Sequence, residues 1–197
     1  MVLLSWIAVA ITLISSTSIL IARNWRISLA WLAAQYLAMF ILLLSHAPLG
    51  TAFVKLIAGW VSRAVIGMMR SSLHNSPAGQ GIWPRARLFR LFAAGAVGVI
   101  VVGVAPSVNH IMADVGAAVV SGALLLAGIG LLHLGMSSRI LRVAQGLLTT
   151  LAGFEILYAA VEGSALITAA LAAITLGVAL VGAYLMIASR SIPVEAS

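Results

Sequence analysis

Two glutamates lie in a part of the chain that should otherwise carry no charge. The chain has four acidic residues, and two of them, Glu155 and Glu162, fall in a long apolar run near the C-terminus. The other two fall in a predicted loop (Asp114) and in the tail (Glu195). An ionised carboxylate within a bilayer is costly, so acids in such segments are rare and usually functional. The chemistry that these residues favour is proton transfer, because a carboxyl group can both hold and release a proton.

The spacing around Glu155 indicates a polar stripe. Glu155, Tyr158 and Glu162 stand at positions i, i+3 and i+7, which share one face of a helix. Such a stripe can point into a bundle and pass protons between water molecules and side chains. Because Glu162 directly precedes Gly163 and Ser164, it is either the outer exit of a proton path or a solvated loop carboxylate.

Two basic side chains are further candidates for the same path. Lys55, the only lysine, lies about one turn inside the helix predicted over 51–69. It either extends to the lipid headgroups or serves as the partner of a carboxylate and a proton carrier. His133 lies in the apolar segment over 115–136. It either bonds a neighbouring helix or joins the relay, because histidine titrates near neutral pH.

Other kinds of chemistry find no support in the sequence. The chain has no cysteine, which excludes disulfides and thiolate metal sites. No two of the four histidines have metal-ligand spacing with carboxylates nearby. The Gly-Ile-Gly sequence over 128–130 lies inside a predicted helix, so it is not a nucleotide-binding loop. The sequence therefore predicts no catalytic residue, no metal and no cofactor for this chain. We expect that it is not an enzyme on its own, and the sequence leaves open whether it is a subunit of an oxidoreductase complex.

The composition is that of a membrane protein. Hydrophobic residues make up 63% and charged residues 8% of the sequence, against about 25% charged residues in a soluble domain. Apolar runs of about 20 residues, the length that crosses a bilayer core, recur from end to end. The net charge of +7 does not indicate nucleic-acid binding, because the arginines stand at the ends of apolar segments, where they act as topology signals. The predicted fold class is all-α, a polytopic bundle of membrane helices.

The apolar runs predict seven transmembrane helices, over 2–22, 27–45, 51–69, 89–104, 115–136, 141–161 and 164–188. The third run is ambiguous, because one of its faces is polar. That face is formed by Lys55, Gly59, Ser62, Arg63 and Arg70. Such a pattern also fits an amphipathic helix on the membrane surface, which would leave six spanning helices.

The distribution of arginine favours the arrangement with seven helices. If the third run spans the membrane, nine arginines fall on one side: Arg23, Arg26, Arg70, Arg85, Arg87, Arg90, Arg139, Arg142 and Arg190. The connections on the other side, at 46–50, 106–114 and 162–163, carry neither lysine nor arginine. Because cytoplasmic connections are enriched in these residues, we expect the N-terminus outside and the C-terminus in the cytoplasm.

The chain divides into two parts and a tail. We expect about four membrane helices within 1–110, with a polar loop over 70–88, then a three-helix unit over 111–190 and a polar tail over 191–197. Small residues within the helices predict close contacts between them. The glycines concerned are Gly95, Gly98, Gly103, Gly116, Gly122, Gly128, Gly130 and Gly135.

The second half of the chain resembles subunit K of respiratory complex I, which has three membrane helices. Over 117–187, a glycine-rich helix ends in the basic turn Ser-Arg-Ile-Leu-Arg, and a helix with Gly-Phe-Glu-Ile-Leu-Tyr-Ala-Ala over 153–160 follows. The latter is similar to the Gly-Leu-Glu-Ile motif of that family, whose proton-path glutamate would correspond to Glu155. The family's second glutamate has no counterpart here, because the matching stretch around Ala173 is apolar.

Over most of residues 1–188 the chain is similar to component E of hydrogenase-4 and of the related formate hydrogenlyase. That family adds N-terminal helices to a K-like unit, and the Ser-Ala-Phe-x-x-Lys-like pattern of its third helix is similar to Thr-Ala-Phe-Val-Lys over 51–55. The resemblance implies a subunit of a redox-driven ion pump in the inner membrane of a prokaryote. Its implied partners are antiporter-like membrane subunits and hydrophilic redox subunits.

Two functions are compatible with these patterns. In the first, the chain is a non-catalytic subunit that contributes Glu155 to a proton path, with Lys55, Glu162, Tyr158 and His133 as further members. In the second, it is a structural scaffold that docks antiporter-like subunits or binds lipids without conducting protons, a reading that the apolar stretch around Ala173 favours. A standalone transporter fits less well, because the sequence shows neither an internal repeat nor a broken helix with several polar ligands.

Overall fold

The computed structural model describes residues 2–22, 24–45, 47–72, 84–112, 115–161 and 164–191. Their regular structure is helical throughout: α1 (Val2–Ile21), α2 (Trp25–Leu43), α3 (Leu49–Ser72), α4 (Pro84–Ile111), α5 (Ala117–Gly135), α6 (Ile140–Val161) and α7 (Ala165–Ser191). All seven helices are long and apolar enough to cross a membrane. The prediction of an all-α polytopic bundle is confirmed.

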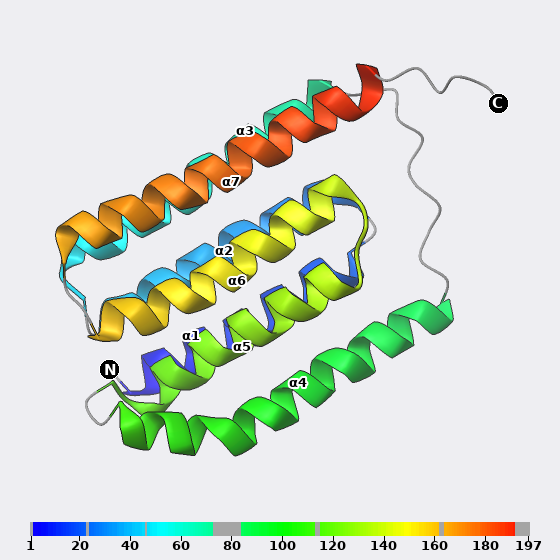
Figure 1. Cartoon of the computed structure of the whole chain (residues 1–197). Helices are drawn as coiled ribbons and strands as arrows, with labels where there is room; N and C mark the ends of the chain where they lie inside the picture. The colour runs from blue at the N-terminus through cyan, green and yellow to red at the C-terminus, as the bar shows by residue number, and fades with distance from the viewer. Residues whose placement is uncertain are drawn as a thin grey trace.

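The helices form two stacked layers (Figure 1). In one layer α1, α2 and α3 lie side by side in chain order, and in the other α5, α6 and α7 do the same. Each helix packs on its counterpart across the layers, α1 on α5, α2 on α6 and α3 on α7, and the helices of each pair run in the same direction. The two layers therefore repeat one arrangement of three helices, although no repeat is visible in the sequence.

The fourth helix connects the two layers and lies at the edge of the bundle. It packs on α5 and, to a smaller extent, on α1. We expected it over 89–104, ending before Pro106, but it runs from Pro84 to Ile111. Proline is well suited to the first turn of a helix, whereas inside a helix it removes one backbone hydrogen bond and produces a bend. Figure 1 shows α4 curving in its C-terminal part, in agreement with the position of Pro106.

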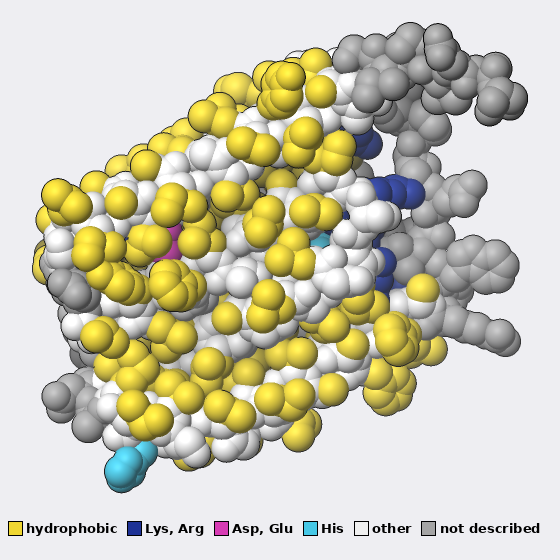
Figure 2. Space-filling model, viewed as in Figure 1, with side chains coloured by type: hydrophobic (Ala, Val, Ile, Leu, Met, Phe, Trp, Pro, Cys, Tyr) yellow, Lys and Arg dark blue, Asp and Glu magenta, His cyan; other side chains and the backbone are white. Residues whose placement is uncertain are grey.

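Most of the arginine side chains gather at one end of the bundle, which we call the arginine-rich end. There α1, α3, α5 and α7 end and α2, α4 and α6 begin (Figures 1 and 2). The arginines at this end whose side chains are described are Arg26, Arg70, Arg87, Arg90, Arg139 and Arg142. Apolar side chains cover the face of the bundle shown in Figure 2, as expected for a surface that contacts lipid.

Two of the central helices approach so closely that their backbones touch. A Cβ atom on Gly153 of α6 would lie 2.5 Å from the backbone nitrogen of Ala127 and 2.6 Å from the backbone oxygen of Ala123, both in α5. A Cβ atom on Gly130 of α5 would lie 2.9 Å from the Cα atom of Thr150 in α6. Membrane helices pack in this way because there is no hydrophobic drive between them and contact must come from van der Waals packing.

The expectation that glycines mark helix contacts is only partly correct. It holds for Gly122, Gly128 and Gly130, where a Cβ atom would collide with a neighbouring helix. It is wrong for four others, where a Cβ atom would meet nothing within 4 Å: Gly95, Gly98, Gly103 and Gly135. Gly116 has another role, since it begins α5 with φ at 85°, a backbone conformation that side chains disfavour.

The third helix belongs to the bundle, and its polar face explains the ambiguity of its sequence. Lys55, Gly59 and Ser62 are buried, on the side of α3 that contacts α2 and α7. These three residues therefore point inwards instead of towards a membrane surface, whereas Arg63 and Arg70 of the same predicted face are only partly buried. With 24 residues, α3 is long enough to span, which supports seven helices over six.

The predicted parts of the chain map onto the structure as follows. The predicted three-helix unit over 111–190 contains α5, α6 and all of α7 except its last residue. Most of the predicted polar loop, at 73–83, lies outside the described residues, as do 192–197 of the predicted tail.

Candidate functional site

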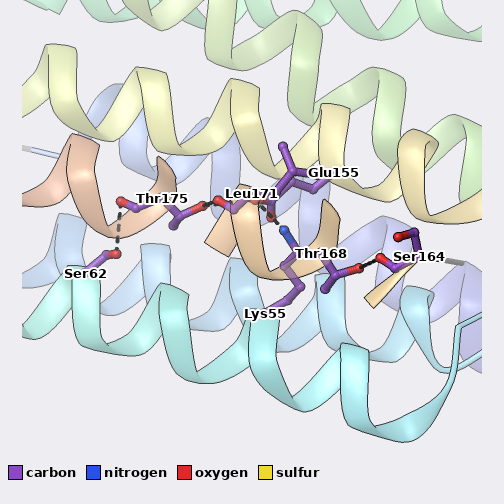
Figure 3. A network of polar contacts seen from close by, with 7 residues as sticks. All are labelled: Lys55, Ser62, Glu155, Ser164, Thr168, Leu171 and Thr175. Atoms are coloured by element: carbon purple, nitrogen blue, oxygen red, sulfur yellow. Dashed lines mark hydrogen bonds and ion pairs between the residues drawn. The ribbon is translucent and has the colours of Figure 1, made fainter. Parts of the chain in front are cut away.

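A lysine and a glutamate form an ion pair in the interior of the bundle. The Nζ atom of Lys55 in α3 lies 2.7 Å from the Oε1 atom of Glu155 in α6 (Figure 3). Both side chains are buried, with 4% of Lys55 and 1% of Glu155 exposed. Of the two roles considered for Lys55, the structure therefore gives it the carboxylate partner and not a position in the headgroups.

The seventh helix contributes a hydroxyl group to the same carboxylate. The Oγ1 atom of Thr175 lies 3.0 Å from Oε1 of Glu155 and equally 3.0 Å from the backbone oxygen of Leu171. A threonine hydroxyl has one proton to donate, so these two acceptors compete for it. Ser62 of α3 in turn donates to the backbone oxygen of Thr175 at 3.3 Å. The ion pair thus stands where α3, α6 and α7 meet (Figure 3).

The pair lies well inside the bundle, nearer to the end opposite the arginines. Lys55 is the seventh residue of α3, which places its backbone about 9 Å from that end at 1.5 Å per residue. Glu155 is the sixteenth residue of α6, about 22 Å from the arginine-rich end. Both distances fall within the apolar thickness of a bilayer, which is about 30 Å.

A tyrosine from α2 closes the site on another side. Tyr36 is 1% exposed, and its ring lies against Gly59 of α3, where any Cβ atom would collide with the ring. The absence of a side chain at position 59 is therefore what admits the ring between the helices. The hydroxyl of Tyr36 has no hydrogen-bond partner among the described residues. It is close enough to Glu155 for the two groups to interact electrostatically.

Further polar side chains are buried between the helices on the arginine-rich side of the pair. Ser28 of α2 donates to Oε1 of Gln145 in α6 at 2.8 Å. Ser16 of α1 donates to Oε1 of Gln35 in α2 at 3.4 Å. The Nε2 atoms of Gln35 and Gln145 are buried without a hydrogen-bond partner in the described part of the chain. Because buried polar atoms nearly always bond to protein or to ordered water, these amides make the interior among α1, α2 and α6 a favourable place for water.

His133 lies with the arginines and not with the ion pair. It is 1% exposed, near the end of α5, and Arg90 and Arg142 are near enough to act on it electrostatically. Arg142 precedes Glu155 by 13 residues on α6, about 20 Å along the helix. The Nε2 atom of His133 makes no hydrogen bond to any described residue, so the expected bond to a neighbouring helix does not come from this atom.

The arginines near His133 bind the ends of helices. Arg90 of α4 donates to the backbone oxygens of Leu20, at 3.0 Å, and Met136, at 3.3 Å. Arg142 of α6 donates to the backbone oxygen of Ala22 at 3.2 Å. The last carbonyl groups of a helix lack partners within it and carry partial negative charge, so they are suitable acceptors for a guanidinium group.

The two other members of the predicted stripe are placed as follows. Tyr158 is half-buried, and its ring stacks on that of Phe154 at a centroid distance of 6.1 Å. Phe154 is 52% exposed, so this pair of rings lies at the surface of α6. Glu162 lies outside the described residues, and its role as an exit or a loop carboxylate stays a prediction.

Three residues of the site were not anticipated from the sequence: Tyr36, Ser62 and Thr175. The sequence held a signal for Thr175, because this residue directly follows the apolar stretch around Ala173 that corresponds to the second glutamate of the subunit K family. Ser62 was noted only as part of the polar face of α3. Tyr36 could not have been found from the sequence, since no local pattern in α2 shows that its ring packs against Gly59 of α3.

The pair has the chemical capacity to exchange a proton. If the proton moves from Nζ of Lys55 to Oε1 of Glu155, both groups become neutral, and the net charge of the site is zero before and after the transfer. A site of constant net charge avoids the high cost of a lone charge in the bilayer. In the part of the chain that the structure describes, no three side chains of metal-binding types lie together.

Comparisons of the chain with known protein families, with functionally characterised proteins and with solved structures found no match.

Proposed function

We propose that the protein is a non-catalytic membrane subunit of a redox-driven ion pump of the complex I or hydrogenase-4 type, in which Lys55 and Glu155 form part of a proton path. The observation that carries the proposal is the buried ion pair, with 2.7 Å between Nζ and Oε1. Charged residues inside membrane bundles usually mark ion paths or proton relays. The resemblance to subunit K and to component E supports the kind of assembly.

The buried polar side chains among α1, α2 and α6 support a route that leads to the pair. Ser28 and Gln145 lie near the arginine-rich end, and Gln35 lies about two turns further along α2, towards the ion pair. The hydroxyl of Tyr36, on which Glu155 acts electrostatically, would be the last protein group of this route. In the proposal, water molecules connect these groups, and His133 stands at the entrance beside Arg90 and Arg142.

We further propose that the arginine-rich end faces the cytoplasm of a prokaryotic cell. Lysine and arginine are enriched in the cytoplasmic connections of membrane proteins. The N-terminus then lies outside and the ion pair in the outer half of the bilayer. The antiporter-like and redox subunits of the assembly would carry out the chemistry that this chain lacks.

A structural scaffold is the second candidate, and a specific observation favours it. Glu155 is held by Lys55 and Thr175 together and is 1% exposed, so the carboxylate already has its partners within the chain. A buried pair of this kind can serve only to join α3 to α6 in the correct register.

The first experiment identifies the assembly. The tagged chain is purified from native membranes in mild detergent, and the copurifying proteins are identified by mass spectrometry. The proposal expects antiporter-like membrane subunits together with redox subunits, in fixed proportion to the chain. Recovery of the chain alone, from membranes in which it is abundant, would contradict a role as a subunit.

The second experiment separates the proton path from the scaffold. The variant Glu155→Gln loses the carboxylate. In the double variant Lys55→Met/Glu155→Gln the site carries no charge, and both new side chains are similar in size to the native ones. If the pair is a proton path, the double variant assembles normally but pumps no protons into proteoliposomes. If the pair is only structural, the double variant both assembles and pumps like the native protein. Arg26→Gln, which removes an exposed charge at the arginine-rich end, is the control and should leave pumping unchanged.

A further inference from the structure

An apolar groove runs along the outside of the bundle between α6 and α7. Its volume is about 470 Å³, and residues that line it include Ala144 and Leu147 of α6 and Ile174, Gly177, Val181 and Leu185 of α7. Most of its lining residues are bulky and apolar, but the absence of a side chain at Gly177 leaves space between them. In particular, a Cβ atom on Gly177 would meet nothing within 4 Å.

The length of the groove matches one leaflet of a bilayer. From Ile174 to Leu185 it follows α7 for 11 residues, or about 16 Å. Half of the hydrocarbon core of a bilayer is about 15 Å thick. A membrane helix of a partner or of a second copy would cross the full thickness, whereas the groove ends half way, at Ile174.

The groove opens at the arginine-rich end, beside a basic residue. Ser138 lines this opening, and Arg139, the next residue along the chain, is exposed. Among the described residues no hydrogen bond or ion pair engages the side chain of Arg139, whereas that of Arg142, one turn further on, donates to the backbone oxygen of Ala22. The first turn of α6, which begins here, holds no acidic residue. An anion at this position therefore meets a free guanidinium group and the positive end of a helix.

We propose that this groove binds one anionic phospholipid of the adjoining leaflet. An acyl chain lies in the groove between α6 and α7, and the phosphate group lies at Ser138 and Arg139. The apolar lining takes up the chain, and the charge at the mouth selects the headgroup. The site is separate from the ion pair and does not depend on the proposed proton path.

Binding is measured by native mass spectrometry of the purified full chain, exchanged into micelles with either phosphatidylglycerol or phosphatidylcholine of identical acyl chains. The native protein should retain one phosphatidylglycerol molecule in clear preference to phosphatidylcholine. Equal retention of the two lipids would overturn the assignment of the headgroup site. A dimer that retains no lipid would overturn the proposal in favour of a second copy in the groove.

The first pair of variants tests the headgroup. Arg139→Ala should lower retention of phosphatidylglycerol about fivefold, the effect of one basic residue at a membrane surface, and leave that of phosphatidylcholine unchanged. Arg26→Ala removes the same charge at the same end but from α2, on the layer that faces away from the groove, and should have no effect. Equal losses in the two variants would show a general effect of charge and contradict the site.

The second pair tests the groove. Gly177→Phe should fill it and abolish retention of both lipids, whereas Gly95→Phe, at an equally open position on α4, should not. Val181→Phe, at another lining position, guards against misfolding of the Gly177 variant, and circular dichroism checks the helix content of each protein. Undiminished lipid retention in a folded Gly177→Phe or Val181→Phe protein would refute binding in the groove.

Discussion

Lys55 and Arg90 are both drawn away from water, but different groups balance their charges. Arg90 lies near the arginine-rich end, where the backbone oxygens of Leu20 and Met136 accept its protons. Lys55 lies inside the bundle, about two turns from the start of α3, where the carbonyl groups of neighbouring helices are already used within those helices. A cation at a helix end therefore needs no acid, whereas one in the interior needs Glu155.

The difference separates structural charges from a group that can do chemistry. An arginine bound to carbonyl groups keeps its proton, because guanidinium does not deprotonate in proteins. A lysine beside a carboxylate has a partner that can receive its proton. The pair of Lys55 and Glu155 is therefore the place, within the described part of the bundle, where a proton can be exchanged between side chains.

The largest effect is expected on breaking the interior pair. Lys55→Met or Glu155→Gln leaves its partner buried without a counter-charge, so each should lower the free energy of unfolding by about 3–5 kcal/mol. The double variant removes both charges and should recover most of that loss. Unfolding of the purified chain in micelles, followed by circular dichroism over a denaturant series, measures all three proteins. Additive losses in the double variant would show that the two side chains do not interact.

A smaller effect is expected at the arginine-rich end. Arg90→Ala removes two charge-assisted hydrogen bonds to helix ends at a half-buried position and should cost about 2 kcal/mol in the same assay. Arg26→Ala is the matched control, because Arg26 is exposed and lies over the ring of Trp25 at 5.4 Å. It should cost less than about 1 kcal/mol. If Arg90→Ala cost as much as the loss of Lys55, the contrast between end and interior would be wrong.

The smallest effect is expected from the hydroxyl group that helps to hold Glu155. Thr175→Val keeps the shape of the side chain but removes its bond to the carboxylate, at a cost of about 1–2 kcal/mol. Thr168→Val, about two turns earlier on the same face of α7, removes only a bond to the backbone oxygen of Ser164 and should lower the free energy of unfolding by less. Equal losses in the two variants would mean that Thr175 contributes nothing to Glu155 beyond its bond within α7.

Much of the fold follows from the sequence. Apolar runs of sufficient length and the one-sided arginines were enough for seven helices, because membrane thickness fixes helix length and charge bias fixes their direction. The ends of α4 were not predicted, since proline inside a membrane helix is tolerated when packing supports it. The roles of the glycines could not be assigned singly, because Gly130 and Gly95 differ only in which helix lies opposite.

The site was predictable in its charges but not in its partners. Glu155 stood out because an acid in an apolar helix is rare, and Lys55 because it is the only lysine. That they meet depends on how α3 and α6 are arranged around α7, which no local pattern specifies. Tyr36 was missed for the same reason. His133 was grouped with Glu155, but it lies beside Arg142, which precedes Glu155 by about 20 Å along α6.

The central claim is that Glu155 gains and loses a proton during transport, and infrared difference spectroscopy tests it most directly. The spectra are recorded on proteoliposomes that contain the native assembly, at rest and while protons are moving. The claim predicts a carboxylic-acid band that rises and falls with transport, shifts on carbon-isotope labelling of glutamate and disappears in Glu155→Gln. A Glu155 that stays ionised throughout, with transport unimpaired, would contradict it and leave the pair as a structural link between α3 and α6.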